Sequence, residues 1–506
     1  MFIRVSWWMC MLARNSRLFI SSCTMLVCAL SGCAVGPDFV RPDAPPVTHY
    51  LNGADPTKTV SAGGAAQHFT PGAKVDADWW RLFKSPKLDA VIMEAMNNSP
   101  GLEAAQASLR QSQDNLRSGY GIFFPDINAD AGANRQKYTP LAAGQDLPAH
   151  IFNLFTLSAT VSYALDIFGG ERRTVEGLGA EVDVARATEH ATYLTLWANI
   201  VNTVIAKAAY RDEIEATQQL IALQKEQIKL AEDQEQAGTV PYSNVLSLKS
   251  QLASYEATLP QIEQKITQSD DLLATLTGHA PAEWKPPEFN LADLTLPSDM
   301  PVSLPSEIVH QRPDILAAEA TAHAASANVG VATAAELPSI TLSGSYGANN
   351  TSVSNLFAAS GNFWGFGANA TAPLFDGGTL WFKRKAATDS YQQATAAYRQ
   401  TVLNAFGQVA DTLRALDHDA AALKAEDDAL AAAEQALQLV QANYHAGLIT
   451  YLDVLNADVQ YHQAKIANLQ AIAVRYQDTV ALFAALGGGW WNTKPIDASA
   501  DGRKGE

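Results

Sequence analysis

Cysteine is almost absent from this sequence of 506 residues, and the four that occur all lie near its start. They are Cys10, Cys23, Cys28 and Cys33, so no disulfide framework can form in the rest of the chain. The short motifs of common enzymes are also missing, because the chain has no HExxH, GxSxG, P-loop or CxxC pattern. Its ten histidines are scattered, and none of them predicts a metal or cofactor site. We therefore expect that the protein is not an enzyme and holds no cofactor.

Positive charge is scarce as well. The chain has 35 Lys and Arg against 52 Asp and Glu, which gives a formal net charge of -17. A protein with this charge repels the phosphates of nucleic acid, so we expect no nucleic-acid partner.

The few arginines near the start precede an apolar run, Leu18 to Gly32. This run is too short to cross a bilayer and is typical of an export signal, which could begin at Met1 or at Met11. It leads into Leu30-Ser31-Gly32-Cys33, the form of a bacterial lipobox, although a cysteine can also end a signal peptide by chance. We predict lipidation at Cys33, and the following Ala34, rather than a retaining aspartate, predicts an anchor in the outer membrane.

Glycine and proline are missing from two very long stretches. Thr379 to Ala446 contains no Pro and only one Gly, and it predicts a helix roughly 100 Å long. Leu452 to Phe483 contains neither residue, and its apolar residues alternate at spacings of three and four, as in a coiled-coil seam. Between them, Gly447 suits the end of one helix and Thr450 suits the cap of the next. The pattern predicts a long antiparallel helical hairpin with a tight tip.

The hairpin occurs twice in the sequence. Gly238 to Leu246 matches Gly447 to Leu455 at an offset of 209, and the same offset relates Gly278 to Gly487. Such an internal repeat is a signal about the whole fold. In each copy the lengths of the two shorter predicted helices add up to that of the long one to within one residue, so they would match it if they lay end to end. The predicted helices are 88–118, 171–237 and 242–278 in the first copy, with a kink at Pro260, and 306–335, 379–446 and 450–486 in the second.

In four short runs apolar residues alternate with small or polar residues, a period of two that is typical of strands. They are 126–134, 155–165, 340–347 and 364–374, and the polar segment 135–150 between the first two predicts a hairpin loop. Each run has about the length of a strand in an outer-membrane barrel, but alternation alone does not distinguish this from a soluble sandwich. Four strands cannot close a membrane barrel, so either the sheet is soluble or several chains share one barrel.

The composition divides the chain into six segments. Residues 1–32 form the predicted signal peptide, and 33–86 form a lipidated tether, rich in Pro, Gly, Ala and Thr, that could run extended over a surface. The two repeats occupy 87–279 and 306–488, separated by the Pro-rich linker 280–305 and followed by the tail 489–506.

Several motifs resemble those of the TolC-like outer membrane factor family, and in particular its lipoprotein branch. This resemblance implies a mainly α fold with membrane β structure: a homotrimer whose four strands per chain close one β-barrel in the outer membrane, continued by a long periplasmic α-helical barrel. The motifs that carry it are Cys33 to Phe39 with Arg41-Pro42, Asp78 to Phe83, Leu304 to Ser306, Arg312 to Ile315, Leu374 to Gly378 and Ala485 to Trp490.

The same resemblance implies a function and partners. The protein would be the exit duct of a tripartite efflux system, anchored in outer membrane lipid and extending into the periplasm. Its partners would be a periplasmic adaptor and an inner-membrane pump, usually of the resistance-nodulation-division type. A conduit for type I protein secretion and a non-transport structural coiled-coil lipoprotein are the alternatives. The lipobox favours efflux, and the alternating strands argue against a purely structural coiled coil.

A gate at the hairpin tips is also implied by the resemblance. Asp453 matches an aspartate that rings the pore, Tyr444 matches a tyrosine that bonds across to the first copy, and Asn244 matches the position of its acidic partner. The sequence departs from the family at Asn456, where a second aspartate is common. Asp453 also fits a capping role three residues after Thr450, so both roles stay open. The apolar tip that an adaptor would contact is expected to be exposed and to comprise Gly238, Val245, Leu246, Gly447, Leu448, Val454 and Leu455.

Overall fold

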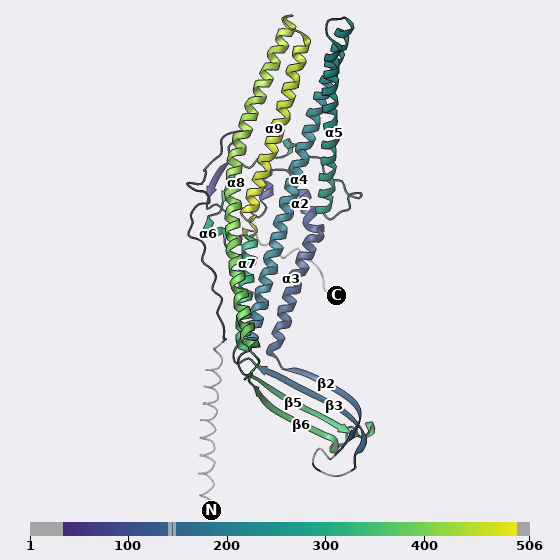
Figure 1. Ribbon diagram of the computed structural model, residues 1–506, viewed down its shortest axis with the longest axis vertical. Coiled ribbons are helices and arrows are strands. Elements are labelled where there is room, and N and C mark those ends of the chain that lie inside the picture. The colour runs from purple at the N-terminus through teal and green to yellow at the C-terminus, as the bar shows by residue number, and fades with distance from the viewer. Residues whose placement is uncertain (1–33, 140–143, 145–147, 493–506) are drawn as a thin grey trace, which may run out of the picture. The chain divides into compact units, whose positions relative to one another are not determined.

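The computed structural model describes residues 34–139, 144 and 148–492, and Figure 1 shows it as a ribbon. The predicted signal peptide and Cys33 therefore lie outside the described residues. Internal contacts divide the chain into two units. The first comprises Arg110–Val184, Ala318–Ala397 and the described residues before Pro42, and the second comprises Pro42–Leu109, Ala185–Ala317 and the described residues from Tyr398 onward.

The first unit contains one antiparallel sheet of four strands in the order β2-β3-β5-β6. Its strands are β2 (Asp126–Tyr138), β3 (His150–Leu165), β5 (Ser339–Asn350) and β6 (Asn362–Thr371). Each repeat supplies one hairpin, and the pairing of β3 with β5 joins the two repeats. Strands β2 and β6 are therefore edges, and no other described strand of this chain pairs with either of them.

The four strands were predicted, but their ends differ from the sequence pattern. Residues Arg135 to Tyr138 and His150 belong to strands rather than to the expected loop, because the ladder continues up to the pair Tyr138 and His150. Strand β6 ends at Thr371, before Pro373, whose missing N–H cannot join a ladder.

The strand register separates the two faces of the sheet. One rung aligns Ile127, Val161, Gly344 and Phe366 on the apolar face, and the next aligns Asn128, Thr160, Ser345 and Gly365 on the polar face. On the apolar face Trp364 is 71% exposed and Phe366 is 84% exposed. A sheet with two unpaired edges and an uncovered apolar face needs further partners.

The second unit holds most of two helical hairpins, whose elements are α4 (Gly170–Gln236) with α5 (Tyr242–Leu276) and α8 (Thr379–His445) with α9 (Tyr451–Ala485). Both long helices have 67 residues and both returning helices have 35. The turns repeat the same geometry, since Gly238 has a φ of 72° and Gly447 a φ of 73°. This left-handed conformation favours glycine and explains why the repeat keeps it at both tips. The two predicted hairpins are confirmed, and α5 runs on through Pro260.

The short helices of each repeat meet end to end, as their lengths predicted. At the end of α9 the carbonyl of Ala485 accepts a hydrogen bond from Arg312, at 2.7 Å, and the next residue begins α7 (Pro313–Ala334). Just after the end of α5, Gly278 approaches Asn98 so closely that a Cβ at this position would collide with the carbonyl oxygen of Asn98. No helix of the described ranges is long and apolar enough to cross a membrane.

The predicted helices 88–118 and 306–335 are each broken in two. The first consists of α2 (Pro86–Asn98) and α3 (Pro100–Gly119), because Pro100 forces Ser99 into an extended conformation. The second divides into α6 (Pro305–Ile308) and α7, whose first residue is Pro313.

The segment 42–83 is packed more tightly than the composition of a tether suggests. Strand β1 (His68–Pro71) pairs in parallel with β4 (Asp299–Val302), and the 3-10 helix η1 (Trp79–Phe83) buries both of its terminal aromatic side chains. The Trp79 ring stacks on Phe483 of α9, with ring centroids 5.1 Å apart.

A buried arginine fastens this segment to α9. The side chain of Arg475 has no exposed surface. Its guanidinium donates to the side chains of Gln67 and Thr59, at 3.1 and 3.2 Å, and to two backbone carbonyls, those of Ala62 and Ala65, at 2.8 and 3.2 Å. This set of contacts holds the segment in one conformation across α9.

Candidate functional site

The tip of the second hairpin is organised by Thr450 and Asp453. The backbone N–H and the hydroxyl of Thr450 both donate to Asp453 Oδ2, at 2.9 and 2.7 Å. These hydrogen bonds lower the pKa of the Asp453 carboxyl, which is fully exposed and stays charged at neutral pH. Asp453 therefore closes the first turn of α9, and its charge still faces solvent.

A hydrogen bond between the two repeats comes from a residue that the sequence did not single out. Tyr451, the first residue of α9, donates its hydroxyl to Glu226 Oε2 of α4 at 2.9 Å. This bond raises the pKa of the Tyr451 hydroxyl because it stabilises the protonated form. Nearby, burial and then the charge of Glu226 raise the pKa of the Asp458 carboxyl on α9.

The roles of Tyr444 and Asn244 in a gate stay a prediction, since one chain does not bring the two side chains into a hydrogen bond. No hydrogen bond joins them in the described part of the structure, where the Tyr444 ring lies 5.4 Å from the Tyr451 ring. Asn244 is exposed near the start of α5, and Asn456 is exposed on α9. The repeat offered a signal for Tyr451, because the offset of 209 aligns it with Tyr242, the first residue of α5.

Two more hydrogen bonds join α9 to the first repeat. Gln463 donates to the hydroxyl of Tyr255 on α5 at 2.9 Å, and Gln470 donates to Glu213 on α4 at 3.0 Å. Together with the bond from Tyr451 they form a polar seam between the two hairpins. Because these groups are partly or fully exposed, water can replace each bond at low cost, so the seam can open without unfolding the helices.

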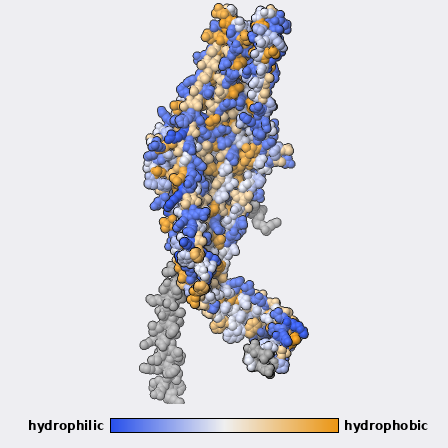
Figure 2. All heavy atoms as spheres, viewed as in Figure 1, coloured by the Kyte–Doolittle hydropathy of each residue, from blue (hydrophilic) through white to orange (hydrophobic). Residues whose placement is uncertain are grey.

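The tip residues divide into two groups. Leu448 is 73% exposed and Leu246 is 50% exposed, and Gly238 and Gly447 are exposed beside them. Figure 2 shows apolar residues at the end of the α8–α9 hairpin. The other three apolar tip residues are buried rather than exposed in one chain, and their contact with an adaptor stays a prediction. These buried residues are Val245, Val454 and Leu455.

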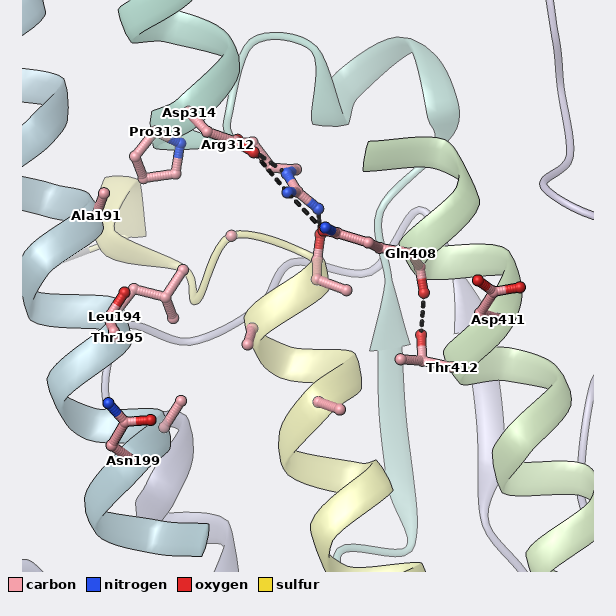
Figure 3. Close-up of a pocket in the computed structure, with 15 residues that line it drawn as sticks. Ala191, Leu194, Thr195, Asn199, Arg312, Pro313, Asp314, Gln408, Asp411 and Thr412 are labelled. Carbon is pink, nitrogen blue, oxygen red and sulfur yellow. Dashed lines mark hydrogen bonds and ion pairs between the residues drawn. The ribbon is translucent and has the colours of Figure 1, made fainter. Parts of the chain in front are cut away.

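A cavity of about 540 Å³ lies where α9 meets the start of α7, and Figure 3 shows its lining. Arg312 is central to it, with a side chain only 7% exposed. Its guanidinium donates to both carboxylate oxygens of Asp314, at 3.0 and 2.6 Å, and to Gln408 Oε1 of α8, at 2.8 Å. Most other lining residues are small, namely Ala191, Thr195, Ala198, Thr412, Ala481, Ala484, Ala485 and Gly487.

The described residues that line this cavity serve to hold the helix junction together. Arg312 is fully engaged in fixing the helix junction, and the small neighbours offer no nucleophile beside a base. Among the described residues, no three His, Cys, Asp or Glu side chains are grouped so that they could hold a metal ion.

The residues that follow Cys33 are fixed in the first unit. Val35 N donates to the carbonyl of Phe168 at 2.9 Å, in the turn between β3 and α4. Arg173 of α4 donates to Asp38 at 2.6 Å, and the Phe39 ring stacks on His323 of α7 with centroids 4.5 Å apart. The first described residues therefore lie beside the turn that joins β3 to α4.

Comparison with known proteins gives consistent matches. A model of the outer membrane efflux protein family matches residues 91–279 and 304–488. The pyoverdine export outer membrane protein OpmQ of Pseudomonas putida is 30% identical over 424 residues, covering 83% of this chain and 90% of the relative. Outer membrane protein OprJ of Pseudomonas aeruginosa is 28% identical over 493 residues, covering 95% and 98%. The solved structure of the outer-membrane channel OprN matches with a TM-score of 0.80 and 26% identity, covering 90% of this chain and 100% of that one.

Proposed function

Because this chain belongs to the outer membrane efflux protein family, we propose that three copies of it form one passive exit duct across the outer membrane. The observation that carries the trimer is the sheet, which has four strands, two unpaired edges and one uncovered apolar face. Pairing β6 of one copy with β2 of the next closes a barrel of twelve strands with the apolar face toward lipid. Family membership in a group of membrane channels excludes the non-transport coiled-coil alternative.

The helices supply the periplasmic part of the duct. Small side chains line the cavity at the α7–α9 junction, and no arrangement of groups there would hold one defined cargo. We therefore assign the choice of cargo to an inner-membrane pump of the resistance-nodulation-division type. The exposed tip residues Leu246 and Leu448, with Gly238 and Gly447, support contact with a periplasmic adaptor, since exposed apolar residues mark interaction surfaces.

The N-terminal contacts support a lipid anchor at Cys33. Ala34 lies against Gly169 in the turn between β3 and α4, so the chain reaches the membrane-facing end of α4 at the residue that follows the cysteine. Acyl chains attached there would enter the bilayer beside the barrel.

Native mass spectrometry of the protein extracted from outer membranes tests the assembly and the anchor together. We expect three chains, each beginning at Cys33 and carrying the added mass of acyl groups. A single chain in mild detergent would contradict the shared barrel, and an unmodified N-terminus at another residue would contradict the anchor.

A second experiment tests the role of Asp453. Three copies of this exposed carboxylate near the entrance would attract cations and repel anions. We expect Asp453→Asn to reduce the preference for cations in planar bilayers, and Asp453→Glu to keep it. Because hydrogen bonds lower the pKa of Asp453, the preference should persist as the pH falls past the ordinary aspartate range and disappear only below it. Asparagine can still accept the hydrogen bonds from Thr450, so an unchanged preference in Asp453→Asn would leave only the capping role.

A further inference from the structure

Arg135 and Lys137 are the only Lys or Arg residues on the four strands of the sheet. They occupy alternate positions near the end of β2, so both side chains leave the same face, about 7 Å apart. Both residues are exposed.

The register places this pair on the apolar face. Going along β2, the positions that share it begin with Ile127, which pairs with Val161, and continue through three alanines to Arg135 and Lys137. The acidic residues of the same strand, Asp126 and Asp130, lie on the opposite, polar face, where Asp130 accepts a hydrogen bond from Thr160 at 3.4 Å. In the proposed barrel the apolar face meets lipid, so both cations point toward the membrane rather than into the duct.

The position along the strand gives their depth. Arg135 is eight residues beyond Ile127, roughly 27 Å along β2, which at the usual tilt is about 20 Å across the membrane. The apolar band of such barrels is about 25 Å tall, so the pair lies at its edge. A cation is strongly unfavourable at the centre of the lipid face but costs close to nothing at that edge.

The connections at the ends of the strands show which leaflet of the membrane the two cations face. The beginning of β2 follows the 3-10 helix η2 (Tyr120–Phe123), which extends α3, and the end of β3 leads into α4. The helices therefore attach at the Asp126 end of the hairpin, and they extend into the periplasm. Arg135 and Lys137 are at the other end, which faces the outer leaflet.

No carboxylate within the described residues pairs with either cation. The contact that Arg135 makes is a long one, 3.4 Å to Asn153 Oδ1 on β3. We propose that Arg135 and Lys137 bind the phosphate groups of the anionic glycolipid of the outer leaflet. The guanidinium can contact two phosphate oxygens at once, and the ammonium adds a second charge within reach of the same headgroup. The site rests on the proposed barrel for the orientation of the apolar face, for the depth of the two cations and for the leaflet that they meet.

The test uses the intact protein, purified from outer membranes and stripped of lipid, titrated with diphosphoryl lipid A and followed by native mass spectrometry. The double variant Arg135→Gln with Lys137→Gln should bind diphosphoryl lipid A at least about tenfold more weakly than the natural chain. Monophosphoryl lipid A should bind the natural chain more weakly than diphosphoryl lipid A, and the double variant should not discriminate between the two.

The matched control changes the opposite face of the same strand. Asp126→Asn with Asp130→Asn should leave the affinity for diphosphoryl lipid A unchanged. Equal affinities for the natural chain and the cation variant would overturn the proposal, and so would an equal loss in the aspartate variant. The same spectra report the number of chains, so a failure of the trimer is distinguished from a failure of the lipid site.

Discussion

Removing the hydroxyl of Tyr451 is expected to raise the current through the closed duct. This hydroxyl donates the hydrogen bond that ties the start of α9 to Glu226 of α4. Because this bond is exposed and water replaces part of it, it contributes about 0.5–1.5 kcal/mol, so its loss shifts an equilibrium between closed and open tips by roughly two- to tenfold. We expect Tyr451→Phe to increase the open probability several-fold in single-channel recordings in planar bilayers. Three such bonds per trimer would multiply the effect if the tips move together.

A neighbouring tyrosine provides the matched control for this experiment. Tyr444 lies beside Tyr451 with ring centroids 5.4 Å apart, but in the described structure it makes no hydrogen bond to the first repeat. Tyr444→Phe should therefore leave the closed current unchanged. Glu226→Gln should have a smaller effect than Tyr451→Phe, since the amide oxygen still accepts a hydrogen bond. Equal currents in the two tyrosine variants would show that the bond from Tyr451 does not hold the tips closed.

Replacing Arg475 with methionine is expected to release the segment 42–83 from α9. The change removes every hydrogen bond of a fully buried guanidinium and leaves Gln67 Oε1 without a donor, whereas the carbonyls of Ala62 and Ala65 keep only the hydrogen bond that each accepts from the other's backbone N–H. A buried acceptor left unsatisfied costs about 1–3 kcal/mol and the other buried hydrogen bonds are lost as well, so the free energy of unfolding should fall by at least about 2 kcal/mol. Urea unfolding followed by circular dichroism measures this loss. Limited trypsin digestion should at the same time show faster cleavage after Lys58 and Lys74 in the released segment.

Arg399→Met is the control for Arg475→Met, because Arg399 is an exposed arginine on α8. It should change the unfolding midpoint little and leave cleavage after Lys58 at the natural rate. A similar small change in Arg475→Met would mean that Trp79 and Phe83 hold the segment without the arginine.

The helices and strands could be predicted because their signals are local. In α9 the apolar residues recur every three or four positions, and in β3 they recur at every second position. Both spacings follow from the geometry of a single helix or strand. Gly238 and Gly447 identified both tips, since a left-handed turn favours glycine wherever the chain folds back. The lengths of the helices even predicted which ends would meet.

The contacts between elements were not predictable in the same way. The bond from Tyr451 to Glu226 depends on how far one hairpin is shifted along the other, and no period in the sequence records that shift. Val454 and Leu455 belong to an apolar tip motif, yet whether they face solvent or their own partner helix depends on the rotation of α9. The hydrogen bond from Arg475 to Gln67 joins residues 408 positions apart in the sequence. Its partner could not be predicted, because an arginine on a long helix is more often exposed.

In the proposed trimer, the duplicated hairpin would also set the number of tips that an adaptor meets. Each chain presents two tips that share a turn geometry but differ in their side chains, with Leu246 half exposed on one and Leu448 more exposed on the other. Three chains would therefore present six tips in two alternating kinds. An adaptor with a single binding surface would therefore meet six binding sites of two different affinities. A substitution in one of the two tips would alter only every second contact around the ring.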